Sequence, residues 1–424
     1  GETIKVLAVI GGGGRTSDRE LNRGDMLERY PMLSVEEALE RVLAEDIYAD
    51  MDIPPLTNSA MDGYAVHAAE TVGASPEQPV RLRIAYDLAA GYTTDVLVTP
   101  GTAIRIMTGA PIPPGADAVV RFEDTERDGK WVKVLKGVGV NKNVRHAGED
   151  VKQGALILPR GTVIRPQEVG MLAALGHKDA LLHRRPRVAI LATGDEVIEV
   201  DAPWQPGKIR NANSYSNAAQ VLKYGGIPVM LGIARDDPGE ISAKIREALD
   251  QEVDLVITSG GVSVGDFDVV KEVLGAEGEM EFWRVQMKPG KPLAFGRIEG
   301  VPLLGMPGNP VSAMISFELF ARPAILKMLG TLDLEKPTIE ATLVDEVRRK
   351  DNRRHFLRVT VERRKGECFA RLTGEQESGI LFSMVKADGL AIIPEERNHL
   401  EAGDRVKVMM LDWPEERRGQ GKSQ

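Results

Sequence analysis

The chain has 424 residues, which is enough for about three domains. Acidic residues (63) outnumber basic residues (54), and the net charge of −9 argues against a dedicated nucleic-acid-binding protein. The single cysteine excludes an intramolecular disulfide and a CxxC metal site. No apolar stretch approaches the ~18 residues of a membrane helix, and the first residues lack the features of a secretory signal. We therefore expect a cytoplasmic protein that binds neither membranes nor nucleic acid.

The N-terminal segment, residues 1–25, stands apart from the rest of the chain. A strand is expected over residues 5–10, and four glycines follow it at 11–14. A phosphate-binding P-loop requires Gly-Lys-Ser/Thr after its glycines, and that pattern is missing here. We interpret this segment as an extension outside the folded domains.

The first well-marked element begins at Ser34. Ser34 and Glu37 form a capping box, and apolar residues on one face predict a helix over residues 35–43. Farther along, between residues 81 and 136, short apolar runs alternate with Pro, Gly and Asp turns. This second pattern predicts a small β-rich region.

Strands and helices alternate after residue 186. Strands are expected over 188–192, 228–233 and 255–258, and helices over 214–223, over 238–249 behind Asp237 as the N-cap, from about 267, and from 311. This alternation predicts a doubly wound α/β domain with a mostly parallel sheet. After residue 336 no further helix is expected. Short strands are expected there over 339–343, 356–361, 370–372, 390–393 and 405–411, which predict a small β-barrel or sandwich.

Three small-residue or glycine-rich segments follow strands of the α/β region, at 193–196, 259–266 and 307–312. Ligands of parallel sheets bind outside the carboxyl ends of the strands, where glycines admit the ligand and helix N-termini attract anions. One such segment alone is better explained as a tight connection. Three at one sheet edge predict an anion-binding site.

Charged residues accompany these segments. Lys288 and Lys291 lie in a Lys-Pro-Gly-Lys-Pro run, and two ammonium groups on a stiff loop suit a phosphate or oxyanion, although an exposed turn is the alternative. Carboxylates near phosphate-binding loops commonly hold Mg²⁺, and the candidates are Asp195, Glu196, Asp236, Asp266 and Asp268. Asp237 is better explained as an N-cap, and Asp266 and Asp268 could cap the helix that follows them.

Other common site patterns are missing. The six histidines show no HxxxH or HExxH spacing, and Gly-x-Ser-x-Gly does not occur. A basic run at 348–354 is better explained as a solvated strand edge than as an RNA-binding surface.

Seven segments together resemble the family of molybdopterin molybdenumtransferases, which includes MoeA and the gephyrin E domain. They occur in the family's order and the resemblance covers about 26–414; the segments are 58–65 (NSAMDGYA), 105–120 (RIMTGAPIPPGADAVV), 148–150 (GED), 193–196 (TGDE), 258–268 (TSGGVSVGDFD), 288–292 (KPGKP) and 307–312 (PGNPVS).

The resemblance implies a multidomain protein of α/β and β parts. It implies a helical and extended linking domain (26–58 and 151–185), an inserted β-rich domain (59–150), a central α/β domain similar to MogA-type adenylyltransferases (186–335), a C-terminal β-barrel (336–414) and a disordered tail (415–424). It further implies a homodimer whose cleft combines domains of both subunits.

The implied reaction takes adenylylated molybdopterin and molybdate, inserts molybdenum into the dithiolene and releases AMP, with Mg²⁺ as cofactor. Catalytic roles are implied for Asp62, Thr108, Asp150, Glu196, Lys288 and Lys291. Substrate contacts are implied for Thr193, Gly194, Asp195, Ser259, Gly260, Gly261, Ser263, Pro307, Gly308, Asn309, Pro310, Ser312, Arg354 and Ser378. Metal ligation is implied for Glu196, Asp236, Asp266 and Asp268.

Several alternatives stay open. Arg353 or Arg358 could replace Arg354 near the oxyanion. The α/β domain alone resembles molybdopterin adenylyltransferases, and a non-catalytic pterin-binding scaffold is a third possibility. Molybdate and tungstate are not distinguished, because both are tetrahedral dianions of nearly equal size. The adenylyltransferase and downstream cofactor-handling proteins are implied partners.

Overall fold

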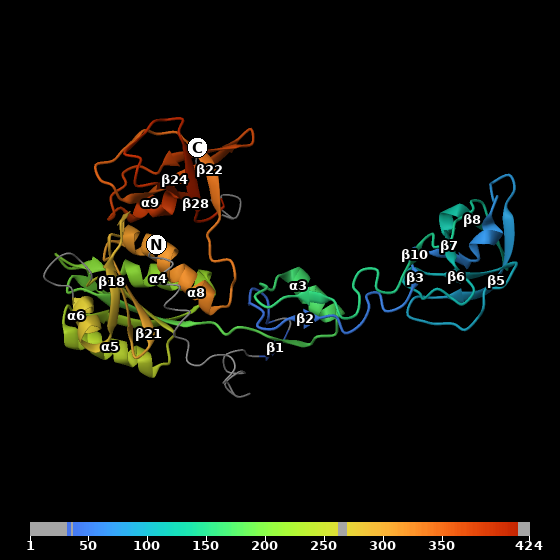
Figure 1. The fold of residues 1–424 in the computed structure, drawn as a ribbon, viewed down its shortest axis with the longest axis horizontal. Helices are drawn as coiled ribbons and strands as arrows, with labels where there is room; N and C mark the ends of the chain where they lie inside the picture. Colours follow the sequence, from blue (N-terminus) through green and yellow to red (C-terminus); the bar gives the residue numbers. More distant parts are fainter. Residues whose placement is uncertain (1–31, 35–36, 262–268, 414–424) are drawn as a thin grey trace. The chain divides into compact units, whose positions relative to one another are not determined.

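The computed structural model describes residues 32–34, 37–261 and 269–413 (Figure 1). The chain divides into two compact units. Unit 1 comprises Gly1–Ala44, Gly161–Arg165 and Asp179–Gln424, and unit 2 comprises Glu45–Arg160 and Pro166–Lys178. Unit 1 therefore contains both the α/β part and the C-terminal barrel, whereas unit 2 contains the β-rich segment.

The α/β part of unit 1 is built on a six-stranded sheet in the order β16-β13-β17-β21-β20-β18. The four parallel strands are β16 (Ile227–Ala234), β13 (Arg187–Thr193), β17 (Leu255–Ser259) and β21 (Val301–Met306). The two antiparallel strands are β20 (Pro292–Ile298) and β18 (Glu279–Arg284). The prediction of a mostly parallel sheet is confirmed. Strands β18 and β20 are not predicted from the sequence; one proline and one glycine, Pro289 and Gly290, lie in the connection between them.

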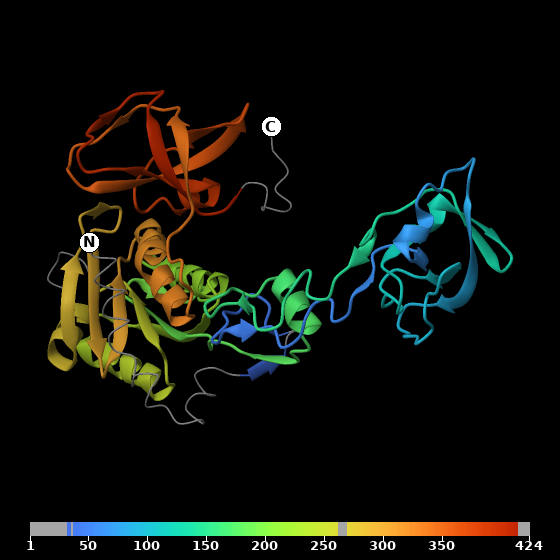
Figure 2. The same cartoon turned by 45° about the vertical axis from the view of Figure 1, so that its right-hand side comes forward.

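Helices cover both faces of this sheet (Figure 2). One face carries α4 (Ala212–Lys223), α7 (Pro310–Ser316) and α8 (Arg322–Met328), and the other carries α5 (Pro238–Asp250) and α6 (Val269–Glu277). In β13, Val188 packs in the first core with Val221 of α4, whereas Ala189 packs in the second core with Ile241 of α5. Because side chains alternate across a strand, a continuously apolar strand needs helices on both faces.

The start of α5 follows its sequence signal. The Asp237 carboxylate accepts a hydrogen bond from the Glu240 backbone N–H at 2.9 Å, and Pro238 occupies the first helical position. The prediction that Asp237 caps this helix is therefore confirmed. Within the described ranges, no helix is long and apolar enough to cross a membrane.

The C-terminal part of unit 1 is a closed five-stranded barrel, in which β24 pairs with both β25 and β26. Its strands are β22 (Thr338–Leu343), β24 (Arg354–Arg364), β25 (Glu367–Leu372), β26 (Gly389–Ile393) and β28 (Arg405–Met410). All five expected strands are present. The expectation that no helix follows residue 336 is wrong, because α9 (Leu381–Lys386) forms there; its six residues are too few to show a clear helical period.

Unit 2 contains a second six-stranded sheet, which confirms the β-rich region. Its order is β7-β4-β6-β5-β9-β8, and the strands are β4 (Gly63–Val66), β5 (Val80–Leu88), β6 (Thr102–Ile106), β7 (Ala118–Arg121), β8 (Thr125–Asp128) and β9 (Trp131–Val134). Strand β4 lies so close to β7 that a Cβ atom on Gly63 would meet the Val120 carbonyl oxygen at 2.0 Å. Only glycine fits at this position. Unit 2 also contains the helix α3 (Pro166–Ala174).

The helix expected over residues 35–43 is not formed by the described residues of that range. Ser34 and Glu37 do make the predicted reciprocal hydrogen bonds, with Glu37 N donating to Ser34 Oγ at 3.3 Å. Glu40 then adopts a φ of 61°, and Val42 and Leu43 form antiparallel bridges with Val163 and Leu182. Pairing of these two buried residues with residues distant in the chain, as isolated bridges, overrides the local helical pattern.

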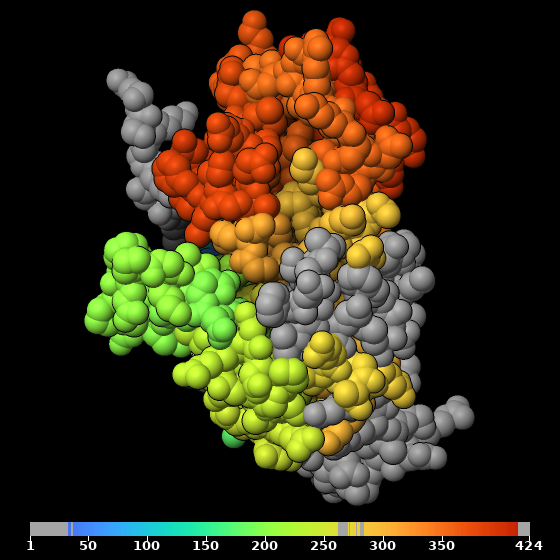
Figure 3. Space-filling view, turned by 90° about the vertical axis from the view of Figure 1, so that its left-hand side faces the viewer, coloured from blue at the N-terminus to red at the C-terminus, as the bar shows by residue number. Residues whose placement is uncertain are grey.

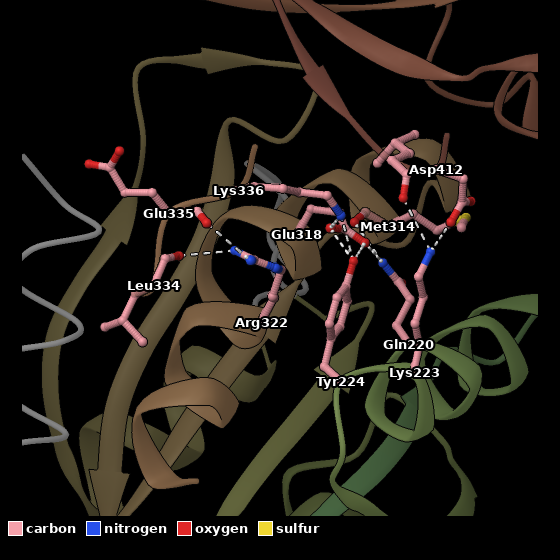
Figure 4. A network of polar contacts seen from close by, with 11 residues as sticks. Gln220, Lys223, Tyr224, Met314, Glu318, Arg322, Leu334, Glu335, Lys336 and Asp412 are labelled. Atoms are coloured by element: carbon pink, nitrogen blue, oxygen red, sulfur yellow. Dashed lines mark hydrogen bonds and ion pairs between the residues drawn. The ribbon is translucent and has the colours of Figure 1, made fainter. Parts of the chain in front are cut away.

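A buried polar network lies where the α/β part meets the barrel (Figure 4). Glu318 lies in the π-helical segment η3 (Phe317–Ala321), which joins α7 to α8. Its carboxylate accepts hydrogen bonds from Tyr224 Oη at 2.8 Å and from Gln220 Nε2 at 2.9 Å, and pairs with Lys336. The Glu318 and Lys336 side chains are only 5% and 7% exposed. Because Lys336 belongs to the connection between α8 and the barrel strand β22, this network fixes the path of that connection.

We expect the substitution Lys336→Met to lower the free energy of unfolding by about 3–5 kcal/mol, because it leaves the Glu318 carboxylate buried without its cation. The matched control is Lys223→Met, which removes a pair with Asp412 whose side chains are 45% and 44% exposed. The control should change stability by less than about 1 kcal/mol. Chemical denaturation followed by circular dichroism measures both, and equal losses would contradict a dominant role for the buried pair.

Candidate active site

Three loops meet at the carboxyl edge of the parallel strands in unit 1. A Cβ atom on Gly260 would lie 2.4 Å from the Thr193 carbonyl oxygen, and one on Gly308 would lie 3.7 Å from the Gly260 Cα. Asn213, at the start of α4, donates its Nδ2 to the Gly308 carbonyl at 2.7 Å. The structure therefore brings the segments that follow β13, β17 and β21 together, as the sequence predicts.

Two hydroxyl groups at this edge have no hydrogen-bond partner among the described residues. Thr193 Oγ1 and Ser259 Oγ are buried and form no hydrogen bond within the described part of the chain. Buried polar groups in proteins are normally paired, and an unpaired one calls for an explanation such as a ligand or water. These hydroxyls, with the nearby glycine amides, favour a polar ligand at this edge.

Carboxylates gather beside the same loops. The Asp236 backbone N–H donates to Asp195 Oδ1 at 3.4 Å, and Lys208 Nζ donates to the Asp195 carbonyl at 2.5 Å. Burial, together with the negative charges of Glu196 and Asp195, raises the pKa of Asp236. A cation beside these groups would relieve that repulsion. The predicted ligands Asp266 and Asp268 and the predicted contact Ser263 lie outside the described residues, and the described residues alone contain no cluster of three metal-binding side chains.

The lysine loop lies between the α/β part and the barrel. Its strand β19 (Met287–Lys288) pairs with β24, with Lys288 opposite His355. A Cβ atom on Gly290 would meet Ser316 Oγ at 2.9 Å and the Ser312 carbonyl at 3.7 Å, so the loop rests on the helix that begins at Pro310. Figure 3 shows gold segments of the α/β part against the orange-to-red barrel. Lys288 is exposed and Lys291 half-buried, and neither ammonium group forms an ion pair or hydrogen bond with another described residue.

A barrel loop completes this part of the site. The Ser378 carbonyl accepts from the Val311 backbone N–H at 3.2 Å, and Ser378 Oγ accepts from Asn309 Nδ2 at 3.0 Å. Asn309 precedes α7 but does not cap it with its own side chain, because its amide is directed to Ser378. The predicted residues Asn309, Ser312 and Ser378 therefore surround the start of one helix.

The three candidate arginines occupy different environments. Arg354 is half-exposed and pairs with Glu395 at 3.1 Å, and Arg353 pairs with Asp351 at 2.8 Å. Arg358 is fully buried: its Nε donates to Ser383 Oγ at 3.0 Å and its Nη2 to the Glu377 carbonyl at 3.0 Å. Burial lowers the pKa of Arg358 to about 10. These hydrogen bonds of Arg358 hold the loop that carries Ser378, and its buried Nη1 has no hydrogen-bond partner among the described residues.

Sequence reasoning missed two features of the barrel. Arg349, in the basic run, is buried and donates to the carbonyls of Arg397 and Pro394 at 2.7 and 2.8 Å, so the interpretation of that run as a solvated edge is wrong for this residue. His355, the neighbour of Lys288, places its Nε2 2.9 Å from Asp351 Oδ1. The Arg349 contacts leave no local sequence signal, because their carbonyl acceptors lie 48 and 45 residues farther along the chain. The His355–Asp351 contact, by contrast, joins residues only four positions apart.

Unit 2 holds the remaining predicted residues. Asp62 Oδ1 accepts from both the backbone N–H and the hydroxyl of Thr108, each at 2.7 Å. The backbone hydrogen bond, followed by that of the side chain, lowers the pKa of Asp62, so its carboxylate stays ionised. Asp150 lines a separate cavity of unit 2. No hydrogen bond links Asp150 to Asp62 or Thr108 within the described residues.

Family models match residues 18–176 (MoeA N-terminal region, domains I and II), 189–327 (probable molybdopterin binding domain) and 340–411 (MoeA C-terminal region, domain IV). These three matches define a chain with the modules of a MoeA protein, in the MoeA order.

Individual relatives extend the match. A molybdopterin molybdenumtransferase 2 of Mycobacterium tuberculosis is 38% identical over 377 residues, covering 87% of this chain and 92% of the relative. The Bacillus subtilis molybdopterin molybdenumtransferase is 35% identical, covering 90% and 91%. The crystal structure of the molybdopterin biosynthesis moeA protein from Pyrococcus horikoshii OT3 aligns with a TM-score of 0.79 at 32% identity, covering 96% and 98%. The chain belongs to the molybdopterin molybdenumtransferase (MoeA) family.

We expect the substitution Arg358→Met to release the loop that carries Ser378, because it leaves the Ser383 hydroxyl and the Glu375 and Glu377 carbonyls without their donor. Amide exchange over residues 373–378 should accelerate about tenfold or more. Arg348→Met is the control, since Arg348 is exposed and, among the described residues, its side chain pairs only with Glu346. Unchanged exchange in the Arg358 variant would show that other contacts hold the loop.

Proposed function

We propose that this chain inserts molybdenum into molybdopterin during molybdenum cofactor biosynthesis. The observation that carries the proposal is the meeting of three glycine-rich loops with a two-lysine loop and Ser378 in unit 1. Backbone amides and unpaired hydroxyls suit phosphate groups, and unpaired ammonium groups suit an oxyanion. Relatives that share most of the chain are named for this reaction.

The proposed substrates are adenylylated molybdopterin and molybdate, with AMP as the leaving product. Thr193, Ser259 and the amides near Gly260 would hold the phosphate groups. Lys288 and Lys291 would balance the charge of molybdate, with Ser312 and Ser378 beside it. Preorganised donors and cations of this kind stabilise charge that develops in the transition state without reorganising at the moment of reaction.

Mg²⁺ is part of the proposal. Glu196 and Asp236 are the described carboxylates that would hold it. Burial, and after it the negative charges of Glu196 and Asp195, raises the pKa of Asp236. When bound, the ion would neutralise charge on the pyrophosphate. We further propose a cytoplasmic homodimer, in which Asp62, Thr108 and Asp150 of one subunit complete the cleft of the other.

Reconstitution with the purified chain tests this function. Adenylylated molybdopterin, molybdate and Mg²⁺ should give molybdenum cofactor and AMP, and cofactor is measured by its ability to activate a cofactor-free molybdoenzyme. Appearance of AMP on the pterin after incubation with molybdopterin and ATP would instead indicate an adenylyltransferase. Pterin binding without turnover in either assay would indicate a scaffold.

Each of the variants Lys288→Gln and Lys291→Gln should raise the molybdate concentration for half-saturation about tenfold or more, because a contact to a charged group is lost. The requirement for adenylylated molybdopterin should change much less. Lys407→Gln, on an exposed position of β28, is the control. An unchanged half-saturation in the double variant would place the oxyanion in another loop.

The variants Asp62→Ala and Lys288→Ala should each be inactive, because Asp62 and Lys288 would act in the same cleft from different subunits. Mixing the two inactive proteins should restore about one quarter of the wild-type activity, since half of the dimers are mixed and each carries one intact site. Light scattering checks the dimer. A fully active monomer, or mixed dimers without activity, would count against the shared cleft.

A further inference from the structure

Unit 2 contains a cavity of about 470 Å³ that lies between two segments of the chain. Residues 53–58 form one wall and residues 144–151 form the other. The walls are joined at one end by the bridge between Ile53 and Val151 and at the other by the pairing of Asn58 with Arg145. Hydrogen bonds from Gly148 N to the Pro54 carbonyl (3.0 Å) and from Asp150 N to the Ile53 carbonyl (3.0 Å) fix its shape. The cavity therefore has a framework defined by backbone contacts.

Among the described residues that line this cavity, Asn58 holds a buried polar atom without a partner, whereas Arg145 and Asp150 have exposed side chains. Asn58 Oδ1 is buried and accepts no hydrogen bond from any described residue. The Asp150 carboxylate and the Arg145 guanidinium also form no hydrogen bond or ion pair within the described ranges. Glu149 is different, because its Oε2 accepts from the His146 backbone N–H at 2.9 Å. An acceptor left unpaired and buried favours a ligand that brings a donor.

The lining has two chemical sides. Asp150 and Asn58 offer oxygen acceptors, and Arg145 offers donors with a positive charge. Ile53 and Pro54 offer apolar surface, against which the face of a flat ring can pack. The volume lies within the range of small-molecule sites, about 300–1,000 Å³. The complementary ligand is a flat heterocycle with adjacent N–H donors on one edge and a carbonyl acceptor beside them.

We propose that this cavity binds the 2-amino-4-oxopyrimidine ring of the pterin. The ring's amino group and adjacent N–H present two parallel donors, which pair with a carboxylate as a guanidinium does. We assign that carboxylate to Asp150, since Glu149 is already engaged, and we assign the contact to the 4-oxo group to Arg145. Adenine, the other base of the proposed substrate, lacks this edge. The inference rests on the proposed function and assigns the pterin ring to residues that the glycine-loop site does not contain.

The test is a fluorescence titration of the full chain with two free ligands. Pterin carries the 2-amino group, and lumazine (2,4-dioxopteridine) replaces it with a carbonyl that a carboxylate repels. The wild-type chain should bind pterin about tenfold or more tightly than lumazine, the value of hydrogen bonds to a charged group. Asp150→Asn should abolish this preference, because an amide also offers donors. Arg145→Met should weaken both ligands, since both carry the 4-oxo group.

The control variant is Asp95→Asn, which changes an exposed aspartate of unit 2 that does not line the cavity. It should keep the wild-type preference. Equal binding of pterin and lumazine, no detectable pterin binding by the wild-type chain, or an unchanged preference in Asp150→Asn would each overturn the inference. A chain that inserts molybdenum but shows no preference contradicts this assignment alone, whereas a chain that shows the preference without turnover contradicts the proposed function alone.

Discussion

The arrangement of unit 1 depends on one buried carboxylate. Glu318 accepts from Gln220 and Tyr224 near the end of α4 and pairs with Lys336 on the way to the barrel. Burying a charge is costly unless its partners are in place, so an arrangement that separates these groups carries a large penalty. Burial lowers the pKa of Lys336, which the Glu318 charge opposes. The charge of Glu318 thus restricts where three elements can lie: α4, the helical segment η3 that carries Glu318, and the connection to the barrel.

The helical run that contains Glu318 also forms part of the candidate site. It begins at Pro310, directly after the Gly308–Asn309 turn, and passes through η3 into α8. The barrel contacts the α/β part at a second place, in addition to the Glu318–Lys336 pair, because Ser378 forms hydrogen bonds with Asn309 and Val311. These two attachments, Lys336 to Glu318 and Ser378 to Asn309, restrict the position of the barrel loop that carries Ser378. The site geometry is therefore a property of the junction and not of either part alone.

Much of the fold could be predicted because its signals are local. The barrel strands show short apolar runs between turns, and Asp237-Pro238 marks the start of α5. The meeting of the loops at 193, 260 and 308 follows from the rule for parallel strands. By contrast, Val42 and Leu43 carry a helical pattern but pair as bridges, and β18 and β20 are recognisable only when they are seen to pair with each other. Partners distant in sequence decide these cases.

The candidate site divides in the same way. Sequence motifs indicate Asp62, and the structure adds that Thr108 holds its carboxylate. Two other features have no local sequence signal, because each depends on the contact of segments that are separate in the chain. One is the hydrogen bond of Arg358 to the loop that carries Ser378, and the other is the buried Asn58 oxygen, which has no partner among the described residues. The roles of the individual site residues stay predictions.

Gly63 illustrates what a motif does and does not preserve. It directly follows Asp62, yet the reason for a glycine there is the close approach of β4 to the Val120 carbonyl. A related chain that had lost its chemistry would still need this glycine to keep its sheet together. The glycine of the motif would then be retained in a relative that no longer has the activity. Loss of Asp62 therefore identifies an inactive relative better than the presence of the residues around it.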